Sequence, residues 1–178
     1  MLMHSNYEII MADGTIKDLF KWQRKMHPML VGTNKITPHI SIREIECENQ
    51  FMISEKVLWV FEELRKKKGG PIKINSGFRT SEYQKELRKK GYRAAITSPH
   101  VHGYALDVDT RSNQETELFV AYLREIRQDF PWLRIGWKKY MDDGSTFVHF
   151  DVAPWYHRHG GPYDSKMYPD SWSKPIEW

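Results

Sequence analysis

The chain has 178 residues, of which 40% are hydrophobic, and its formal net charge is +4. This length supports one domain with a hydrophobic core, and two full-sized domains would not fit comfortably. Cys47 is the only cysteine, which excludes an intramolecular disulfide framework and a redox pair of thiols.

No segment approaches the roughly 20 consecutive apolar residues of a membrane span. Residues 1–8 also lack the basic start and the apolar run of a secretory signal peptide. We therefore expect a protein without a membrane span that is soluble, and cytoplasmic, where it is synthesised.

The positive charge by itself would favour a polyanionic partner, such as nucleic acid or the acidic polymers of a cell wall. The basic runs Arg65–Lys68 and Arg88–Lys90, however, fall at the ends of predicted helices, where cations interact favourably with the helix dipole. We interpret them as solvated helix ends and predict no specific nucleic-acid partner. No pattern indicates an oligomeric state.

The first predicted element is a helix over residues 15–27, which Pro28 ends. A short helical turn is expected over 41–48. Ser54 is the predicted N-cap of a stronger helix that ends at Lys68, because apolar residues follow it at helical spacing.

The remaining predicted elements alternate between short strands and helices. A capping box of Ser81 with Gln84 begins one helix, and a second box of Ser112 with Glu115 begins another. Turn-forming residues over 141–145 precede the last strand. The predicted strands are 72–75, 105–109, 133–137 and 146–152. The predicted helices are 81–90 and 113–130.

Residues 154–178 differ in kind, because aromatic residues are interleaved there with Gly, Pro and charged residues without a helical or strand period. We expect this tail to wrap the core and cover a hydrophobic face, since aromatic side chains bury large areas. The alternative role is a wall of a substrate cleft. The aromatic residues are Trp155, Tyr156, Tyr163, Tyr168, Trp172 and Trp178.

Two segments, Ser98–Asp107 and Phe147–Asp151, alternate metal-binding and apolar residues. Successive side chains of a strand point to opposite faces, so Asp107 would face away from the core while its neighbours enter it. If the two strands pair, Asp107 and His149 become neighbours, with Cβ atoms about 4.5–5.5 Å apart. His100, in the loop before the first strand, would supply a third ligand.

Two imidazoles and one carboxylate suit Zn²⁺, which binds nitrogen and oxygen ligands tetrahedrally. Catalytic zinc sites use three protein ligands and keep the fourth position for water. We therefore predict His100, Asp107 and His149 as ligands of a catalytic Zn²⁺.

The first segment matches the SxHxxGxAxD pattern and thereby resembles the M15 zinc D-Ala-D-Ala metallopeptidases, whose scaffold is similar to that of lysostaphin-type endopeptidases and the hedgehog domain. Phe147–Asp151 resembles the second-histidine strand of the subgroup that cleaves murein cross-links, and Ile72–Thr80 resembles the strand and turn before the metal motif. The residues at the fixed positions of the pattern are Ser98, His100, Gly103, Ala105 and Asp107.

This resemblance covers residues 41–153 and implies an α+β fold, in which a small antiparallel sheet carries the zinc site and is flanked by helices. We accordingly expect a single peptidase domain over 1–178. Residues 1–40 would form an N-terminal helical extension, 41–153 the core that matches the family, and 154–178 the C-terminal wrap.

The chain departs from the family at the general base. Relatives often place Glu, Asp or His two or three residues before the second histidine, where this chain has Phe147 and Thr146. Asp151 is our first substitute, because it shares the strand face of His149. An equally weighted role for it is a hydrogen bond that orients the imidazole. Weaker candidates for the base are His102, Asp142 and Asp143.

Arg79 has a planar guanidinium that suits a substrate carboxylate or a developing oxyanion, and the resemblance implies that it contacts substrate. Its alternative role is a salt bridge that fastens the turn. Ser76 and Ser98 are predicted to position substrate rather than act as nucleophiles, because neither lies in a nucleophile elbow.

The leading hypothesis is a zinc peptidase acting on peptidoglycan stem peptides or their cross-links. Lack of a signal peptide beside a cell-wall substrate suggests a phage-type endolysin, acting after release or carried in a virion. One alternative is a D-Ala-D-Ala carboxypeptidase or dipeptidase, which needs a closed pocket for a free carboxylate. The other is a non-catalytic zinc-binding module for cell-wall recognition or virion structure.

Overall fold

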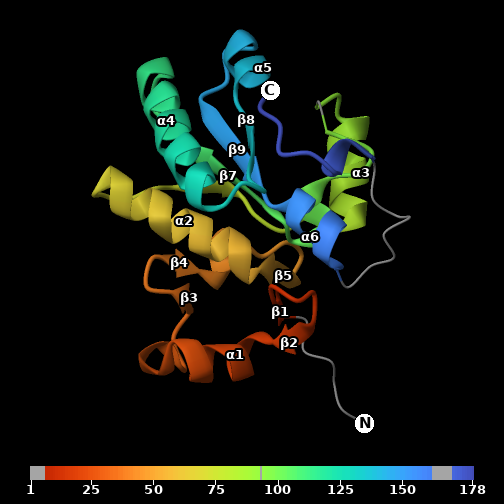
Figure 1. Ribbon diagram of the computed structural model, residues 1–178. Helices are drawn as coiled ribbons and strands as arrows, with labels where there is room; N and C mark the ends of the chain where they lie inside the picture. Colours follow the sequence, from red (N-terminus) through yellow and green to blue (C-terminus); the bar gives the residue numbers. More distant parts are fainter. Residues whose placement is uncertain (1–6, 93, 162–169) are drawn as a thin grey trace.

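The computed structural model describes residues 7–92, 94–161 and 170–178, which fold into an α+β structure (Figure 1). A four-stranded antiparallel sheet carries the predicted metal ligands. Its strands, in spatial order, are β6 (Ile74–Ser76), β7 (Ala105–Asp109), β9 (Phe147–Asp151) and β8 (Arg134–Gly136). This agrees with the predicted fold class, a small antiparallel sheet flanked by helices.

Two long helices cover one face of this sheet, α2 (Glu55–Lys68) and α4 (Asn113–Asp129), and they lie side by side in Figure 1. The strand residues on this face are fully buried and apolar, as their alternation predicts, so the opposite face is left to the polar residues. The buried residues are Leu106, Val108, Val148 and Phe150.

The caps of both helices follow the predicted pattern. The Ser54 hydroxyl accepts hydrogen bonds from two backbone N–H groups of the first turn of α2, and the Ser112 hydroxyl accepts one from Glu115 at the start of α4. Gly69 ends α2 in the left-handed conformation, with φ 69°. The Arg65–Lys68 run forms the last turn of α2, as expected. The N-cap of α3 (Ser81–Lys89) is Thr80, whose hydroxyl accepts a hydrogen bond from the Tyr83 N–H, and not the predicted Ser81.

The N-terminal part contains more strands than expected. The helix predicted over 15–27 begins only at Leu19, because residues 16–18 form a strand and the Asp18 carboxylate caps the helix. The prediction of a helical extension over 1–40 is therefore wrong. The elements here are β1 (Tyr7–Ile10), β2 (Ile16–Asp18), α1 (Leu19–Met26), β3 (Lys35–Thr37), β4 (Ile40–Ser41) and β5 (Phe51–Ser54).

β1 lies at the centre of a second sheet, antiparallel to β2 and parallel to β5. This sheet is therefore mixed, unlike the antiparallel sheet that carries the predicted metal ligands. β3 and β4 form a separate two-stranded ladder. Two short 3₁₀ turns lie among these elements, Pro28–Leu30 and Ile42–Glu44, and the second falls within the turn predicted over 41–48. Two more, in the described residues further along the chain, are Pro99–His102 and Asp170–Trp172.

The C-terminal part holds two short helices where turns and irregular chain were predicted, α5 (Lys138–Asp142) and α6 (Ala153–His159). The final residues run beside β8, and the Trp178 N–H donates to the Ile135 carbonyl at 3.0 Å. Tyr156 and Trp172 are buried, as expected for a wrapping tail, whereas Tyr163 and Tyr168 lie outside the described residues.

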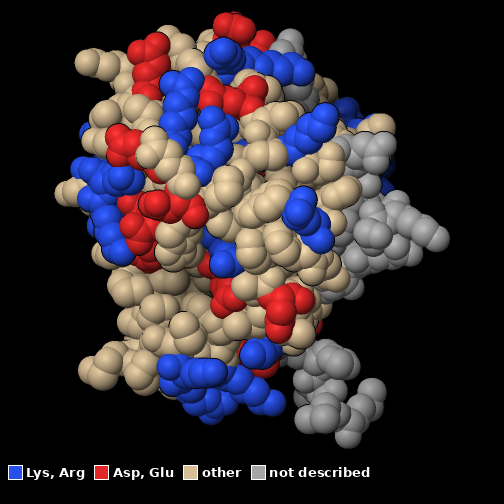
Figure 2. Space-filling view, viewed as in Figure 1, with Lys and Arg blue, Asp and Glu red and all other residues tan. Residues whose placement is uncertain are grey.

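Acidic and basic side chains are interspersed over most of the face seen in Figure 2, with a basic group over α1. Mixed charge of this kind is typical of a solvated surface. Within the described parts of the chain, every helix is too short or too polar to cross a membrane.

Candidate metal centre

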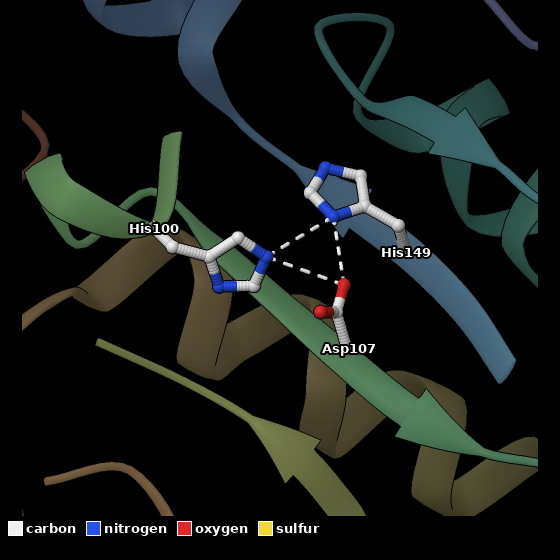
Figure 3. A group of neighbouring side chains, drawn as sticks. All are labelled: His100, Asp107 and His149. Carbon is white, nitrogen blue, oxygen red and sulfur yellow. Dashed lines mark hydrogen bonds and ion pairs between the residues drawn. The ribbon is translucent and has the colours of Figure 1, made fainter. Parts of the chain in front are cut away.

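Three side chains converge on the polar face of the four-stranded sheet (Figure 3). His100 comes from the turn before β7, Asp107 from β7 and His149 from the neighbouring β9. Asp107 pairs directly with His149 in the β7–β9 ladder, which is the register that the alternation predicts. All three residues are buried, so the sheet and its connections hold the polar atoms away from bulk solvent.

The atoms that face one another are His100 Nε2, His149 Nδ1 and Asp107 Oδ1. The two nitrogens lie 3.3 Å apart, and Oδ1 lies 3.2 Å from the first and 2.8 Å from the second. Tetrahedral zinc with ligands at about 2.0–2.1 Å requires its ligand atoms to be separated by about 3.3 Å. Two of the separations match this requirement and the third, at 2.8 Å, is shorter, and the three residue types are ordinary zinc ligands.

The outer nitrogen of each imidazole has a partner that fixes the ring. His100 Nδ1 lies 2.6 Å from the Gly77 carbonyl, which can only accept a hydrogen bond, so the neutral ring presents a lone pair at Nε2. His149 Nε2 lies 2.9 Å from Asp151 Oδ2, which leaves the lone pair of the neutral ring on Nδ1. Both lone pairs therefore point to the same centre, the arrangement that metal-binding histidines adopt.

The turn that carries His100 is shaped by local contacts of its sequence motif. The Ser98 hydroxyl accepts a hydrogen bond from the His100 N–H, which caps the 3₁₀ turn. Gly103 ends the turn with φ 68°, and a Cβ at this position would lie 2.6 Å from the Met52 carbonyl oxygen. Only glycine allows both this conformation and this close approach. Ser98 thus helps to hold His100 in place.

The electrostatics show how strongly the three groups interact without a metal. Burial lowers the pKa of His100. Burial also opposes protonation of His149, but its hydrogen bonds to Asp107 and Asp151 raise the pKa of His149 to about 9. Burial alone would raise the pKa of Asp107, yet the two histidines hold it below its usual range. A metal cation would take over the charge-balancing role of the proton on His149.

Asp151 lies behind His149, with no exposed surface. Its Oδ1 accepts hydrogen bonds from Arg134 Nε at 2.8 Å and from the Ala153 N–H at 3.0 Å, and its Oδ2 contacts His149. Arg134 stands opposite Asp151 in the β8–β9 ladder. Since both carboxylate oxygens are engaged, the geometry supports the orienting role weighed for Asp151 over the role of general base.

Arg79 borders the centre from the turn after β6, and its Nη2 lies 2.8 Å from Asp107 Oδ2. Its Nε donates to the Ser76 hydroxyl, and Nη1 makes a long contact of 3.4 Å with Gln84. A guanidinium has five N–H hydrogens. These contacts use three of them, so two have no acceptor among the described residues. Arg79 therefore fastens the turn and still has N–H groups for a ligand.

The centre opens into a cavity of about 840 Å³, whose lining includes Arg79 and all three converging residues. Its walls include Trp172 and Trp178, in the cleft-wall role weighed for the tail, and also Arg134, Tyr140 and Ile176, which the sequence patterns did not assign to the site. Gly136, opposite His149, lets the Trp178 indole approach, because a Cβ there would lie 2.8 Å from the ring. The tail thus forms both a wrap and a cleft wall.

The other candidates for a base are less well placed. Asp143 lines the cavity but is exposed, and Asp142 is absent from the lining that the described residues form. His102 is also outside that lining, and burial lowers its pKa to about 4. The ring centroids of His102 and Trp172 lie 5.3 Å apart.

Fold and centre together define the class of protein: an α+β protein with a His–Asp–His centre at the wall of a cavity. The sequence model of the family described as Peptidase M15 matches residues 16–150. The chain therefore belongs to the M15 peptidase family, which confirms the resemblance drawn from the metal motif.

Among solved structures, the chain is similar to the Serratia marcescens L-Ala D-Glu endopeptidase ChiX, with 16% sequence identity and a TM-score of 0.46. This similarity covers 56% of the present chain and 79% of that protein. None of the curated proteins matches the chain.

Proposed function

We propose that this M15 peptidase is zinc-dependent and hydrolyses peptide bonds in the stem peptides or cross-links of peptidoglycan. The observation that carries the zinc assignment is the convergence of His100 Nε2, Asp107 Oδ1 and His149 Nδ1 at zinc-ligand separations beside an open cavity. Zn²⁺ bound there would activate water and polarise the scissile carbonyl.

The remaining residues of the site have roles that follow from their contacts. Asp151 and Arg134 hold the His149 ring, and Ser98 holds the turn of His100. Arg79 turns its two unused N–H hydrogens to a carboxylate or carbonyl oxygen of the substrate, and Ser76 positions the guanidinium. These contacts orient the substrate and ligands so that little rearrangement is needed during reaction.

The peptidoglycan substrate rests on the family resemblance of the metal motif and of the strand around His149. The cavity of about 840 Å³ is at the large end of ligand sites, which suits an extended peptide of several residues. We place its action at the cell wall, after phage-type release or from a virion. A carboxypeptidase of the same family would instead bind a free terminal carboxylate.

A second candidate function is zinc-dependent recognition without catalysis. The observation that favours it is the pair Thr146 and Phe147 at the positions where relatives carry an acidic residue or histidine. Both hypotheses require the metal, but only the first requires bond cleavage.

Digestion of purified peptidoglycan by the zinc-loaded protein separates them, with the products identified by mass spectrometry. We expect new amino termini within the stem peptides or cross-links, loss of activity with a chelator, and recovery on adding zinc. His149→Ala should lose both zinc and cleavage. His39→Ala is the matched control, because His39 is exposed and contacts Glu62 away from the centre. Intact peptidoglycan at equimolar zinc would reject the enzymatic function.

A further inference from the structure

Tyr140 contributes a phenol to the cavity into which the metal centre opens. It lies on α5, lines the same cavity as the three converging residues, and is half-buried. Its neighbours Lys139 and Asp143 also line the cavity but are exposed. Tyr140 is therefore the group of α5 that combines a titratable proton with a sheltered position.

Tyr140 is held by an aromatic contact and by the attachment of α5 to the tail. It packs against Phe147, with 4.3 Å between ring centroids and 33° between ring planes. Relatives often carry the base at the position of Phe147. In this chain the Phe147 ring packs against Tyr140, and both rings line the cavity. Trp178 lines the same cavity as Tyr140. The backbone N–H of Trp137, just before α5, donates to the Trp178 carbonyl at 2.7 Å, which joins the helix to the tail.

Burial and nearby charges together determine the protonation state of Tyr140. Burial raises the pKa of Tyr140, and the carboxylates of Asp107 and Asp151 raise it further, while Trp178 and Arg79 act in the opposite direction. Since the ordinary pKa of a tyrosine is 10.0 and burial raises it here, the phenol keeps its proton at neutral pH, as a hydrogen-bond donor must.

We propose that Tyr140, from the wall of the cavity that α5 forms, donates its phenol O–H as a hydrogen bond to the carbonyl oxygen of the scissile amide. This role rests on the proposed function and adds a catalytic residue outside the metal motif. The hydrogen bond strengthens as negative charge develops on that oxygen, and no net proton transfer is required.

Tyr140→Phe tests the proposal, because it removes only the hydroxyl and keeps the ring that packs against Phe147. Removal of one such donor lowers kcat by about 100- to 1,000-fold in known cases. We expect a loss of this size in peptidoglycan cleavage with less than about a threefold change in KM, and unchanged zinc content. Tyr83→Phe, on α3 and outside the cavity lining, is the matched control and should match the wild type.

A second measurement does not depend on turnover. Isothermal titration calorimetry measures the affinity of the zinc-loaded proteins for acetohydroxamate. Its oxygens provide acceptors for the phenol, so Tyr140→Phe should bind it about tenfold more weakly than the wild type or Tyr83→Phe. Equal affinity of wild type and Tyr140→Phe would overturn the proposal, as would equal kcat. If the wild type leaves peptidoglycan intact while the titration depends on Tyr140, the proposed function fails and the Tyr140 contact stands.

Discussion

Replacing Asp151 by Asn separates the two roles that the sequence allowed for this residue. Asp151→Asn keeps the size of the side chain and removes the negative charge between His149 and Arg134. Both members of the Arg134–Asp151 ion pair are buried: the Arg134 side chain is 5% exposed and the Asp151 side chain is 0% exposed. The change therefore weakens the hold on the His149 ring and leaves a buried guanidinium without its counter-charge.

Two magnitudes follow. Loss of a carboxylate that orients a ligating histidine typically lowers metal affinity by about 10- to 100-fold. Removal of one partner of a buried ion pair costs about 3–5 kcal/mol of unfolding free energy. We expect Asp151→Asn to lower zinc affinity by about 10- to 100-fold, measured by competition with a chromophoric chelator. Chemical denaturation of the metal-free protein should show the loss of stability.

Asp109→Asn is the matched control on β7. Asp109 also follows a ligand by two residues, but its carboxylate contacts Lys73 at 3.5 Å and Asn75 at 3.0 Å, at the surface. Removal of such an exposed pair costs only about 0–1 kcal/mol. If Asp151→Asn bound zinc as tightly as wild type while turnover was lost, the orienting role would be refuted and Asp151 would be the base.

Three further predictions concern the fold and the metal. Gly103→Ala should destabilise the protein by at least about 1 kcal/mol in denaturant unfolding, because alanine is strained at positive φ, whereas Gly70→Ala, with open space at its Cβ, should not. Hydrogen bonds from Arg111 lower the pKa of Glu115 from 4.5 to about 2, so its stabilising contribution is complete above pH 4.5 and is lost as pH falls to about 2. Glu115→Gln should remove this part of the acid dependence of the unfolding free energy; parallel curves for the two proteins would contradict it. Zinc at 100 times its Kd should stabilise the native state by about 2.7 kcal/mol, so an unchanged Tm after chelation would argue against a native-state site.

The metal centre could be predicted from the sequence because its information is local. Alternation around Asp107 and His149 determines which side chains leave the core, and one antiparallel pairing brings them together. The turn of His100 is likewise encoded by Ser98 and Gly103, which act within a few residues. Helices α2 and α4 were predicted for the same reason, since their caps and apolar stripes are contained in their own segments.

Elements that depend on distant partners were missed. β1 and β2 are short, and β1 is stabilised by its parallel neighbour β5, more than 40 residues away in the chain. The helical spacing over 15–27 therefore could not show that residues 16–18 would pair as a strand. Local propensity is a weak guide where long-range pairing determines the backbone.

The sequence by itself determined the family, the three converging residues and the helices that support their sheet, because each depends on periodicity or on a compact motif. Only the tertiary structure decided that Asp151 is locked behind His149 by Arg134, and that Tyr140 and Trp178 line the cavity. Arg134, Tyr140 and Trp178 come from segments without a diagnostic pattern, and the contacts of Asp151 depend on Arg134 from another strand. Their roles arise from strand register and from the path of the tail, which are set by packing of the whole chain.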